Sequence, residues 1–457
     1  MTSFYLGAAR SARSTSSYEI PADHLVTHGV VVGMTGSGKT GLLTVLVEEA
    51  LRNQIPVLMI DVKGDLPNLM LTLPSFTAEE MAPWVEAPAN ATAEQRLGVA
   101  AARVEARKKS LGEWGISPRG VQKFDQKIAV RVITPGSSAG ELLHVLSSLE
   151  RRSPRWDDDP ESARSTLSAA ISLVLRLVGR EADPAKSREH VLLSVLAERR
   201  LVANQPADIA ALLEDLELPP IERIGALPLE RFVTKKARRD LAAALNSLLA
   251  SPTFASWRQG ATLDVGSWMQ PVNGRTPATI VSVAHLDDDE RALVLGVLLE
   301  EVLSWVRGLP GAQSLRALVV FDEVYGFLPP HPAAPPTKKP LVALMKQARA
   351  FGVGVLIATQ NPMDLDYRAL SNAGLWCIGR LQTDADRARV VEGMKLAQGD
   401  DDLDYDAMLR QLEPRWFLVR DAHAKGRPKC VQPRWAITVL RGPMTRQEIR
   451  RARSKAA

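Results

Sequence analysis

The chain has 457 residues, of which 46% are hydrophobic and 24% charged, a globular composition sufficient for about two to three domains. Its formal net charge of +5 is a weak excess for this length and favours a polyanionic partner only slightly. No apolar run approaches the about eighteen residues that a membrane helix needs, and the start of the chain lacks an apolar stretch long enough for a secretory signal. Cys377 and Cys430 form no C-x-x-C pair, and no His/Cys cluster suggests a zinc site. We therefore expect a soluble cytoplasmic protein without a membrane anchor.

The first part of the chain has the pattern of a strand, a glycine-rich turn, a helix and a second strand. The expected elements are a strand at 30–33, a helix at 39–53 and a strand at 56–61, followed by a third short strand at 128–134. This β-α-β beginning predicts a parallel sheet. Between about 151 and 260 the pattern changes to Ala- and Leu-rich helical periods, which predicts a helical insertion.

Strands resume after this insertion and alternate with helices. A long helix is expected at 288–306. The expected strands are 278–286, 317–323, 353–360, 375–381 and 415–421. Because these strands are apolar throughout, we expect helices on both faces of the sheet.

The predicted fold class is α/β, with a mostly parallel sheet covered by helices and interrupted by a helical insertion. The expected domains are an N-terminal extension (1–20), a discontinuous core (21–150 and 261–440), the insertion (151–260) and a basic C-terminal tail (441–457).

The stretch GVVVGMTGSGKTG matches two phosphate-binding patterns. From Gly33 it reads as a P-loop, G-x-x-x-x-G-K-[ST]; from Gly36 it reads as the dinucleotide pattern G-x-G-x-x-G, with Asp61 where a ribose carboxylate would lie. The second pattern makes no demand at Lys39 and Thr40, whereas a P-loop requires both. The P-loop therefore explains more of the sequence, and a dehydrogenase is disfavoured.

A P-loop predicts ATP and Mg²⁺ as ligands. Backbone N–H groups of 36–40 would surround the phosphates, Lys39 would reach the β and γ oxygens, and the Thr40 hydroxyl would bind Mg²⁺. The sequence leaves the role of Asp61 open. The expected nucleotide-binding residues are Gly33, Thr35, Gly36, Ser37, Gly38, Lys39, Thr40, Gly41 and Asp61.

Polar residues at the ends of two later strands fit the same chemistry. Asp322 ends an apolar strand and can hold the Mg²⁺ water shell, while Glu323 can orient and activate the attacking water. Gln360 ends another strand, where its amide can contact the γ-phosphate or the water. Arg349 precedes that strand and is expected at the opposite edge of the sheet, either as a surface arginine or as an arginine finger for a neighbouring subunit.

Together these segments resemble the HerA-FtsK group of P-loop ATPases, the HerA-like helicases in particular. The matching segments are GMTGSGKT, IDVKGDL, LVVFDE, QARAFGVGVLIATQNPMDLDYRALSNAG and IGRLQTDADRARVVEGM. The resemblance implies a RecA-like core and a ring, typically hexameric, that hydrolyses ATP to move double-stranded DNA through a central channel. Only about 30 residues precede the P-loop, too few for the N-terminal β-barrel of archaeal HerA, so docking to a nuclease through that barrel is not implied.

Carried over by motif, Asp322 would bind Mg²⁺, Glu323 would be the catalytic base and Gln360 the sensor. Arg349 matches the arginine-finger position, and Arg380 is a second choice for a phosphate or subunit contact. Positive side chains on loops would contact DNA phosphates without reading sequence. The first candidates are Lys338 and Lys339, and the second are Lys235, Lys236, Arg238 and Arg239.

Two other functions fit the same ATPase core. One is a motor with a protein cargo, as in secretion and conjugation ATPases. The other is a nucleotide-gated scaffold, for example of an antiviral complex with a separate nuclease or effector. Glu323 and Gln360 together favour turnover over gating.

Overall fold

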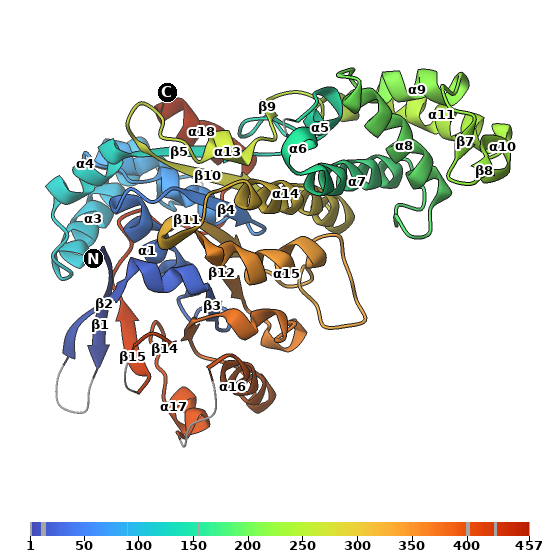
Figure 1. Ribbon diagram of the computed structural model, residues 1–457. Coiled ribbons are helices and arrows are strands. Elements are labelled where there is room, and N and C mark those ends of the chain that lie inside the picture. The colour runs from blue at the N-terminus through green and yellow to red at the C-terminus, as the bar shows by residue number, and fades with distance from the viewer. Residues whose placement is uncertain are drawn as a thin grey trace.

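The computed structural model describes residues 2–10, 15–88, 90–153, 155–398, 403–424 and 427–456. Over these residues, one sheet of 11 strands runs through the molecule in the order β2-β1-β15-β14-β13-β3-β12-β11-β4-β10-β5 (Figure 1). Its strands are β1 (Ser3–Arg10), β2 (Thr15–Pro21), β3 (Gly29–Val32), β4 (Val57–Asp61), β5 (Ile128–Ile133), β10 (Thr276–Ser282), β11 (Ala312–Asp322), β12 (Phe351–Thr359), β13 (Leu375–Ile378), β14 (Phe417–Asp421) and β15 (Lys429–Pro433).

The central strands are parallel, from β5 through β10, β4, β11, β12 and β3 to β13. At the other side of the sheet, β14, β15, β1 and β2 pair antiparallel. The expected N-terminal extension therefore contributes two strands to the sheet, with Gly7 opposite Pro433. This pairing was not predicted, because β1 and β15 are more than 400 residues apart in the chain.

Helices cover both faces of the sheet because its strands are apolar on both sides. Val31 and Met59 point to one core, together with α1 (Lys39–Arg52) and α3 (Ala93–Gly112). Val30 and Ile60 point to the other core. The first face also carries α4 (Pro118–Lys127) and α18 (Arg446–Ala456), and the second carries α7 (Pro160–Leu177), α14 (Asp288–Arg307), α15 (Lys338–Gln347) and α16 (Asp384–Gln398). This arrangement confirms the predicted α/β fold class.

The region from Ser147 to Ala255 projects to one side of the sheet and is mainly helical (Figure 1). Besides α7, it contains α5 (Ser147–Glu150), α6 (Arg155–Asp158), α8 (Arg188–Val202), α9 (Ile209–Glu217), α10 (Leu229–Phe232), α11 (Lys235–Ala250) and α12 (Pro252–Ala255), with a small hairpin of β7 (Arg223–Ile224) and β8 (Leu227–Pro228). An ion pair of 2.9 Å between Arg155 and Glu301 ties it to α14. Ser162 and Ser304 add a hydrogen bond of 2.8 Å between α7 and α14.

The remaining short elements connect these layers. They are α2 (Ala78–Met81), α13 (Val265–Trp268), α17 (Tyr405–Arg410), β6 (Leu143–His144) and β9 (Ala261–Thr262), with the 3₁₀ helices η1 (Ala22–Thr27), η2 (Leu66–Met70), η3 (Ala82–Trp84), η4 (Ala348–Ala350), η5 (Pro362–Asp364) and η6 (Ala369–Asn372).

The basic tail expected at 441–457 is largely the helix α18. It buries Ile449 and Ala452 in the core on the α1 face. Throughout the described residues, no helix combines the length and apolar character needed to cross a membrane.

Candidate nucleotide site

The sequence-predicted catalytic residues follow neighbouring parallel strands. The P-loop follows β3, Asp61 ends β4, the Asp322-Glu323 pair ends β11, and Gln360 follows β12. Because the carboxyl ends of parallel strands meet at one edge, the chain brings these groups together there.

The P-loop has a backbone shape that glycine permits. Gly36 and Gly38 have φ values of 78° and 96°, in a region that other residues rarely adopt. Thr35 donates a hydrogen bond of 2.8 Å to the side-chain oxygen of Gln360, so the loop contacts the proposed sensor directly. Ser37 is buried, and its hydroxyl has no hydrogen-bond partner among the described residues.

Lys39 lies across the P-loop at the start of α1. Its ammonium donates to the carbonyl of Gly33 at 2.5 Å and to that of Met34 at 3.2 Å. Burial, followed by the nearby cation of Lys63, lowers the pKa of Lys39 to about 8. A buried cation bonded only to carbonyls can gain strong contacts from phosphate oxygens.

Asp322 is a buried carboxylate with one oxygen, Oδ2, that has no hydrogen-bond partner among the described residues. Burial, followed by the charge of Asp61, raises the pKa of Asp322 to about 7. An unpartnered oxygen of this kind fits a divalent cation, which would compensate its charge. The described residues contain no group of three or more His, Cys, Asp or Glu that could hold a metal. Mg²⁺ commonly binds one or two carboxylates plus substrate phosphates, so the single carboxylate suits a metal that arrives with a nucleotide.

Glu323 is held from three sides. Its Oε1 accepts hydrogen bonds from the Thr359 hydroxyl at 2.9 Å and from the Gln360 backbone N–H at 3.1 Å. Its Oε2 pairs with the ammonium of Lys63 at 2.5 Å. Glu323 also has a φ of 63°, which is unusual for a residue with a side chain and is often associated with functional sites.

Lys63 was missed by the sequence analysis, which considered only Asp61 in the segment IDVKGDL. The sole available signal was a lysine just beyond the end of a buried strand, and many surface lysines share it. Its contact with Glu323 joins positions 260 residues apart.

Asp61 ends β4 at this same edge, but its carboxylate is hydrogen-bonded within the protein. It is fully buried, and its oxygens accept hydrogen bonds from the Gly64 N–H at 2.9 Å and the Ser282 hydroxyl at 2.7 Å, with a longer bond from the Leu66 N–H. Burial raises the pKa of Asp61 to about 6. Asp61 therefore shapes the loop that carries Lys63, and its contact with the nucleotide stays a prediction.

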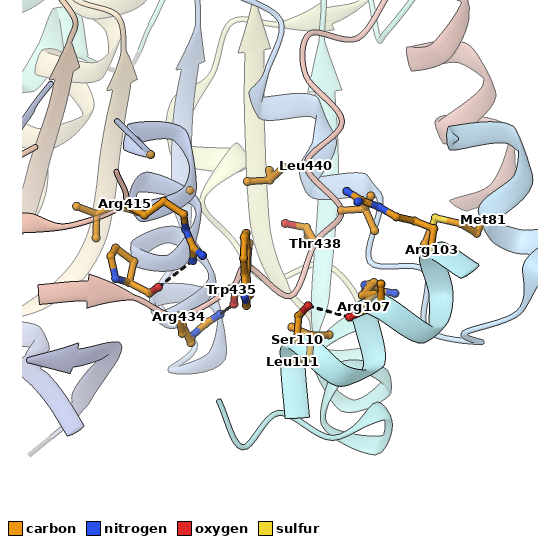
Figure 2. Close-up of a pocket in the computed structure, with 17 residues that line it drawn as sticks. Met81, Arg103, Arg107, Ser110, Leu111, Arg415, Arg434, Trp435, Thr438 and Leu440 are labelled. Carbon is orange, nitrogen blue, oxygen red and sulfur yellow. Dashed lines mark hydrogen bonds between the residues drawn. The ribbon is translucent and has the colours of Figure 1, made fainter. Parts of the chain in front are cut away.

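A pocket of about 410 Å³ opens beside the first turn of α1 (Figure 2). Its walls come from the first turn of α1, from α3, from Arg415 just before β14 and from the segment after β15. The lining residues include Gly38, Gly41, Leu42, Arg103, Arg107, Arg415 and Trp435. No sequence motif pointed to this pocket.

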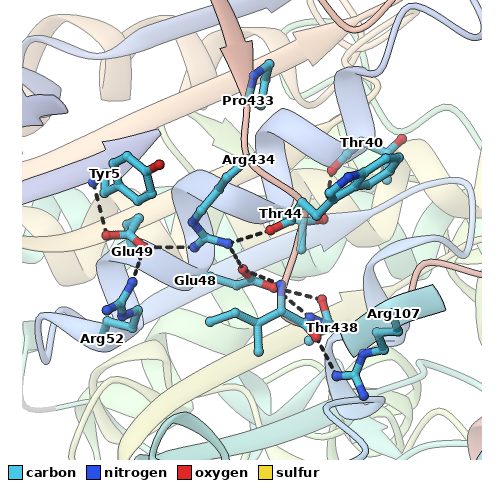
Figure 3. Close-up of polar contacts among 12 residues, drawn as sticks. Tyr5, Thr40, Thr44, Glu48, Glu49, Arg52, Arg107, Pro433, Arg434 and Thr438 are labelled. Carbon is cyan, nitrogen blue, oxygen red and sulfur yellow. Dashed lines mark hydrogen bonds and ion pairs between the residues drawn. The ribbon is translucent and has the colours of Figure 1, made fainter. Parts of the chain in front are cut away.

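A buried ion cluster fixes the segment after β15 to the P-loop helix (Figure 3). Arg434 is almost fully buried and pairs with Glu48 and Glu49 of α1, each at 2.8 Å. Glu48 also accepts hydrogen bonds from the backbone of Ile437 and Thr438, each at 2.9 Å.

The two candidate arginines lie apart from this cluster. Arg349 is exposed in η4, at the start of β12, about 25 Å or more from Gln360 at 3.3 Å per strand residue. Arg380 is exposed after β13, and its backbone carbonyl accepts a hydrogen bond of 2.8 Å from Met34 of the P-loop.

The basic residues considered for DNA contact differ in availability. Lys338 pairs with Asp366 at 3.2 Å and is largely buried, and Arg238 is buried and pairs with Glu230. Each of these two side chains is packed beside a carboxylate, which leaves it less available for a phosphate contact. The exposed members of the two sets are Lys339, Lys235, Lys236 and Arg239.

Comparison with known proteins agrees with this geometry. Residues 4–166 match the family model described as the central domain of the helicase HerA, in agreement with the resemblance seen in the sequence motifs. The structure of VirB4 from Thermoanaerobacter pseudethanolicus is similar, with a TM-score of 0.53, 12% identity, and coverage of 94% of this chain and 96% of that one. No curated protein matches the chain significantly.

The plasmid coupling protein TrwB has the same fold. Its complex with ADP and Mg²⁺ gives a TM-score of 0.52 at 15% identity, covering 96% of this chain and 98% of TrwB. Its complex with the non-hydrolysable GTP analogue GDPNP gives 0.52 at 15% identity, with 97% of each chain covered. At these identities the similarity establishes the fold alone.

Proposed function

We propose that the protein is a HerA-like P-loop ATPase and a ring-forming motor that couples Mg-ATP hydrolysis to movement along double-stranded DNA. The observation that carries the hydrolytic part is Glu323, a buried carboxylate held by Thr359, Gln360 and Lys63 at the edge where the P-loop lies. A scaffold that only binds nucleotide has no need of an oriented base.

The nucleotide would take up the unsatisfied groups of this edge. Lys39 would exchange its two carbonyl contacts for phosphate oxygens, and Thr40 and Asp322 would hold Mg²⁺. When bound, the metal supplies positive charge to the β and γ phosphate oxygens. TrwB, which shares the fold, has been obtained with ADP and Mg²⁺.

In hydrolysis, Glu323 would accept a proton from a water as its oxygen bonds to the γ-phosphorus and the bond to ADP breaks. Thr359 and the Gln360 N–H fix one carboxylate oxygen and so aim the other. Because the Gln360 side chain contacts Thr35, a change at the γ-phosphate can move the P-loop and β12 together.

The ring is proposed from the location of Arg349. This residue is exposed and lies at the opposite edge from its own nucleotide site, so it could serve only the site of a neighbouring subunit. A hexamer is the assembly that the HerA-FtsK resemblance implies. Arg380, beside the P-loop, is the second candidate for an interface contact.

DNA would be bound through phosphate contacts rather than base reading. The available cations are Lys339 at the start of α15 and Lys235, Lys236 and Arg239 on α11. Lys339 lies at the end of the segment that connects Glu323 to α15. Helix α11 belongs to the projecting helical region (Figure 1).

A conjugation-type ATPase is the second candidate. The fold similarity to the bacterial conjugative coupling protein TrwB covers 96% of this chain. In this reading the cargo includes a protein, and the ring acts with partner proteins such as a nuclease or effector.

The test is steady-state ATP hydrolysis by the purified protein with Mg²⁺, with and without linear double-stranded DNA, beside Glu323→Gln. Stimulation by DNA that Glu323→Gln abolishes would support the DNA motor. Combined Lys235→Ala, Lys236→Ala and Arg239→Ala substitutions should then weaken stimulation and reduce its salt dependence, whereas Lys123→Ala on α4 should not. Brisk hydrolysis that ignores DNA would favour the conjugation-type protein cargo, and binding without hydrolysis would favour a gated scaffold.

A further inference from the structure

The pocket beside α1 begins where the P-loop ends. Gly38 is the N-cap of α1, and Gly41 and Leu42 lie in its first turn, beside the expected phosphate site. A Cβ placed at Gly41 would meet no atom within 4 Å, so the helix opens directly onto free space. A nucleotide with its phosphates on the P-loop would extend its ribose and base past Gly41 into this pocket.

The pocket contains one exposed tryptophan, Trp435, with 42% of its surface accessible. The guanidinium of Arg415 lies over its ring at 3.3 Å from the centroid. Arg415 is itself fixed, because its N–H donates to the Ser37 carbonyl and its guanidinium to the Pro433 carbonyl, each at 3.1 Å. Figure 2 shows Trp435 between Arg415 and the α3 side chains of Arg107 and Ser110, so one face of the indole remains turned toward α3.

We propose that Trp435 is the platform on which the nucleotide base stacks, and that this pocket accepts adenine and guanine nucleotides alike. The proposal rests on the proposed nucleotide-dependent function and assigns its base-binding residues. A volume of about 410 Å³ lies within the range of small-ligand sites. Aromatic stacking tolerates any base, because every base presents a π face.

The lack of purine selection follows from the polar groups in the pocket walls. Every charged side chain in the walls of this pocket is an arginine, and the walls carry no carboxylate, Asn or Gln that would select the adenine amino group. The hydroxyls of Ser110 and Thr438 can accept from that amino group or donate to guanine O6, so they favour neither purine. Arg107 is committed to the carbonyls of Thr72, Leu73 and Ile437. Arg103 is exposed, and its donors suit N7, an acceptor that both purines share.

The ion cluster holds the platform in place. Arg434, next to Trp435, is anchored to Glu48 and Glu49 on α1, the helix that begins at Lys39 (Figure 3). The Ile437 and Thr438 backbone is bonded to the same Glu48. The base platform and the phosphate site are therefore parts of one rigid unit, which reduces the ordering that nucleotide binding requires.

The experiment is calorimetric binding of ADP, GDP and inorganic tripolyphosphate, each with Mg²⁺, to wild type and Trp435→Ala. We expect Trp435→Ala to weaken ADP and GDP binding about tenfold or more while leaving tripolyphosphate binding unchanged. Trp435→Phe should restore most of the affinity because it restores a π face. Trp114→Ala, at a partly buried tryptophan outside the pocket walls, should leave all three affinities unchanged.

Each other outcome has a distinct meaning. Unchanged ADP binding by Trp435→Ala, with binding abolished in Lys39→Ala, would overturn the stacking platform and leave the ATPase proposal standing. A more than tenfold preference of wild type for ADP over GDP would overturn the lack of purine selection. Equal losses for ADP and tripolyphosphate would show a structural effect and overturn the platform, whereas wild type that binds no nucleotide would refute the proposed function itself.

Discussion

The guanidinium of Arg434 lies in the interior between two carboxylates of the P-loop helix, and its replacement tests how firmly that helix is tied to the C-terminal segment. Arg434→Met keeps the length of the side chain and removes its charge. Removing one partner of a buried ion pair costs about 3–5 kcal/mol, because the remaining charge is left uncompensated. Glu48 keeps donors from Ile437 and Thr438, so we expect the lower end, about 3 kcal/mol.

A matched control exists at the same carboxylate. Arg52 pairs with Glu49 at 2.8 Å, but its side chain is 46% exposed. Exposed ion pairs contribute about 0–1 kcal/mol because water competes for both charges. Arg52→Met should therefore lower the free energy of unfolding by about 1 kcal/mol at most.

The assay is urea unfolding followed by tryptophan fluorescence, with the three proteins in the same buffer. With a slope of about 3 kcal/mol per molar urea, the midpoint should fall by about 1 M in Arg434→Met and by about 0.3 M or less in Arg52→Met. A loss below about 1 kcal/mol in Arg434→Met, or equal losses in both variants, would refute the reasoning that burial makes this pair decisive.

Three further predictions concern the catalytic edge, the ring and the pH response. Lys63→Met should lower kcat for ATP hydrolysis about tenfold with little change in KM, because Lys63 positions Glu323. An unchanged or higher kcat in steady-state kinetics would show instead that the ion pair restrains the base. Arg349→Ala and Lys39→Ala should each be inactive, and mixing the two variants should restore part of the ATPase rate. A Lys39→Ala subunit still offers its arginine to the intact P-loop of an Arg349→Ala neighbour. No recovery on mixing would contradict an arginine finger that acts between subunits. Burial lowers the pKa of His28 from 6.5 to about 4. The neutral imidazole should therefore contribute about 3 kcal/mol to the free energy of unfolding above about pH 6.5, and this contribution should be lost as the pH falls toward 4. His28→Asn should flatten that part of the pH dependence of urea unfolding, and an unchanged slope would exclude His28 as its source.

The nucleotide edge could be predicted because its signals are local. The P-loop pattern, the acidic pair after β11 and the glutamine after β12 each lie within a few residues of a strand end. Once the strands are expected to be parallel, their carboxyl ends must meet at one edge. The position of Arg349 at the other end of β12 follows from the same argument.

The central strands and the helical region could also be predicted. Strands buried on both faces appear in the sequence as continuous apolar runs, and amphipathic helices appear as apolar residues with a helical period. The N-terminal strands gave no comparable signal. β2 contains several polar residues on its exposed side, and its place in the sheet depends on β1, which pairs with β15 at the far end of the chain.

By itself the sequence determined the chemistry available at each strand end, because residue type and local pattern are enough to place a phosphate loop and an acid pair. Only the tertiary structure decided which polar groups meet. Asp61 turned inward to shape a loop, Lys63 reached Glu323, and Lys338 was paired with Asp366. A polar side chain is stabilised by whatever partner packing brings within about 3 Å, and that partner can lie hundreds of residues away, as Arg434 does from Glu48.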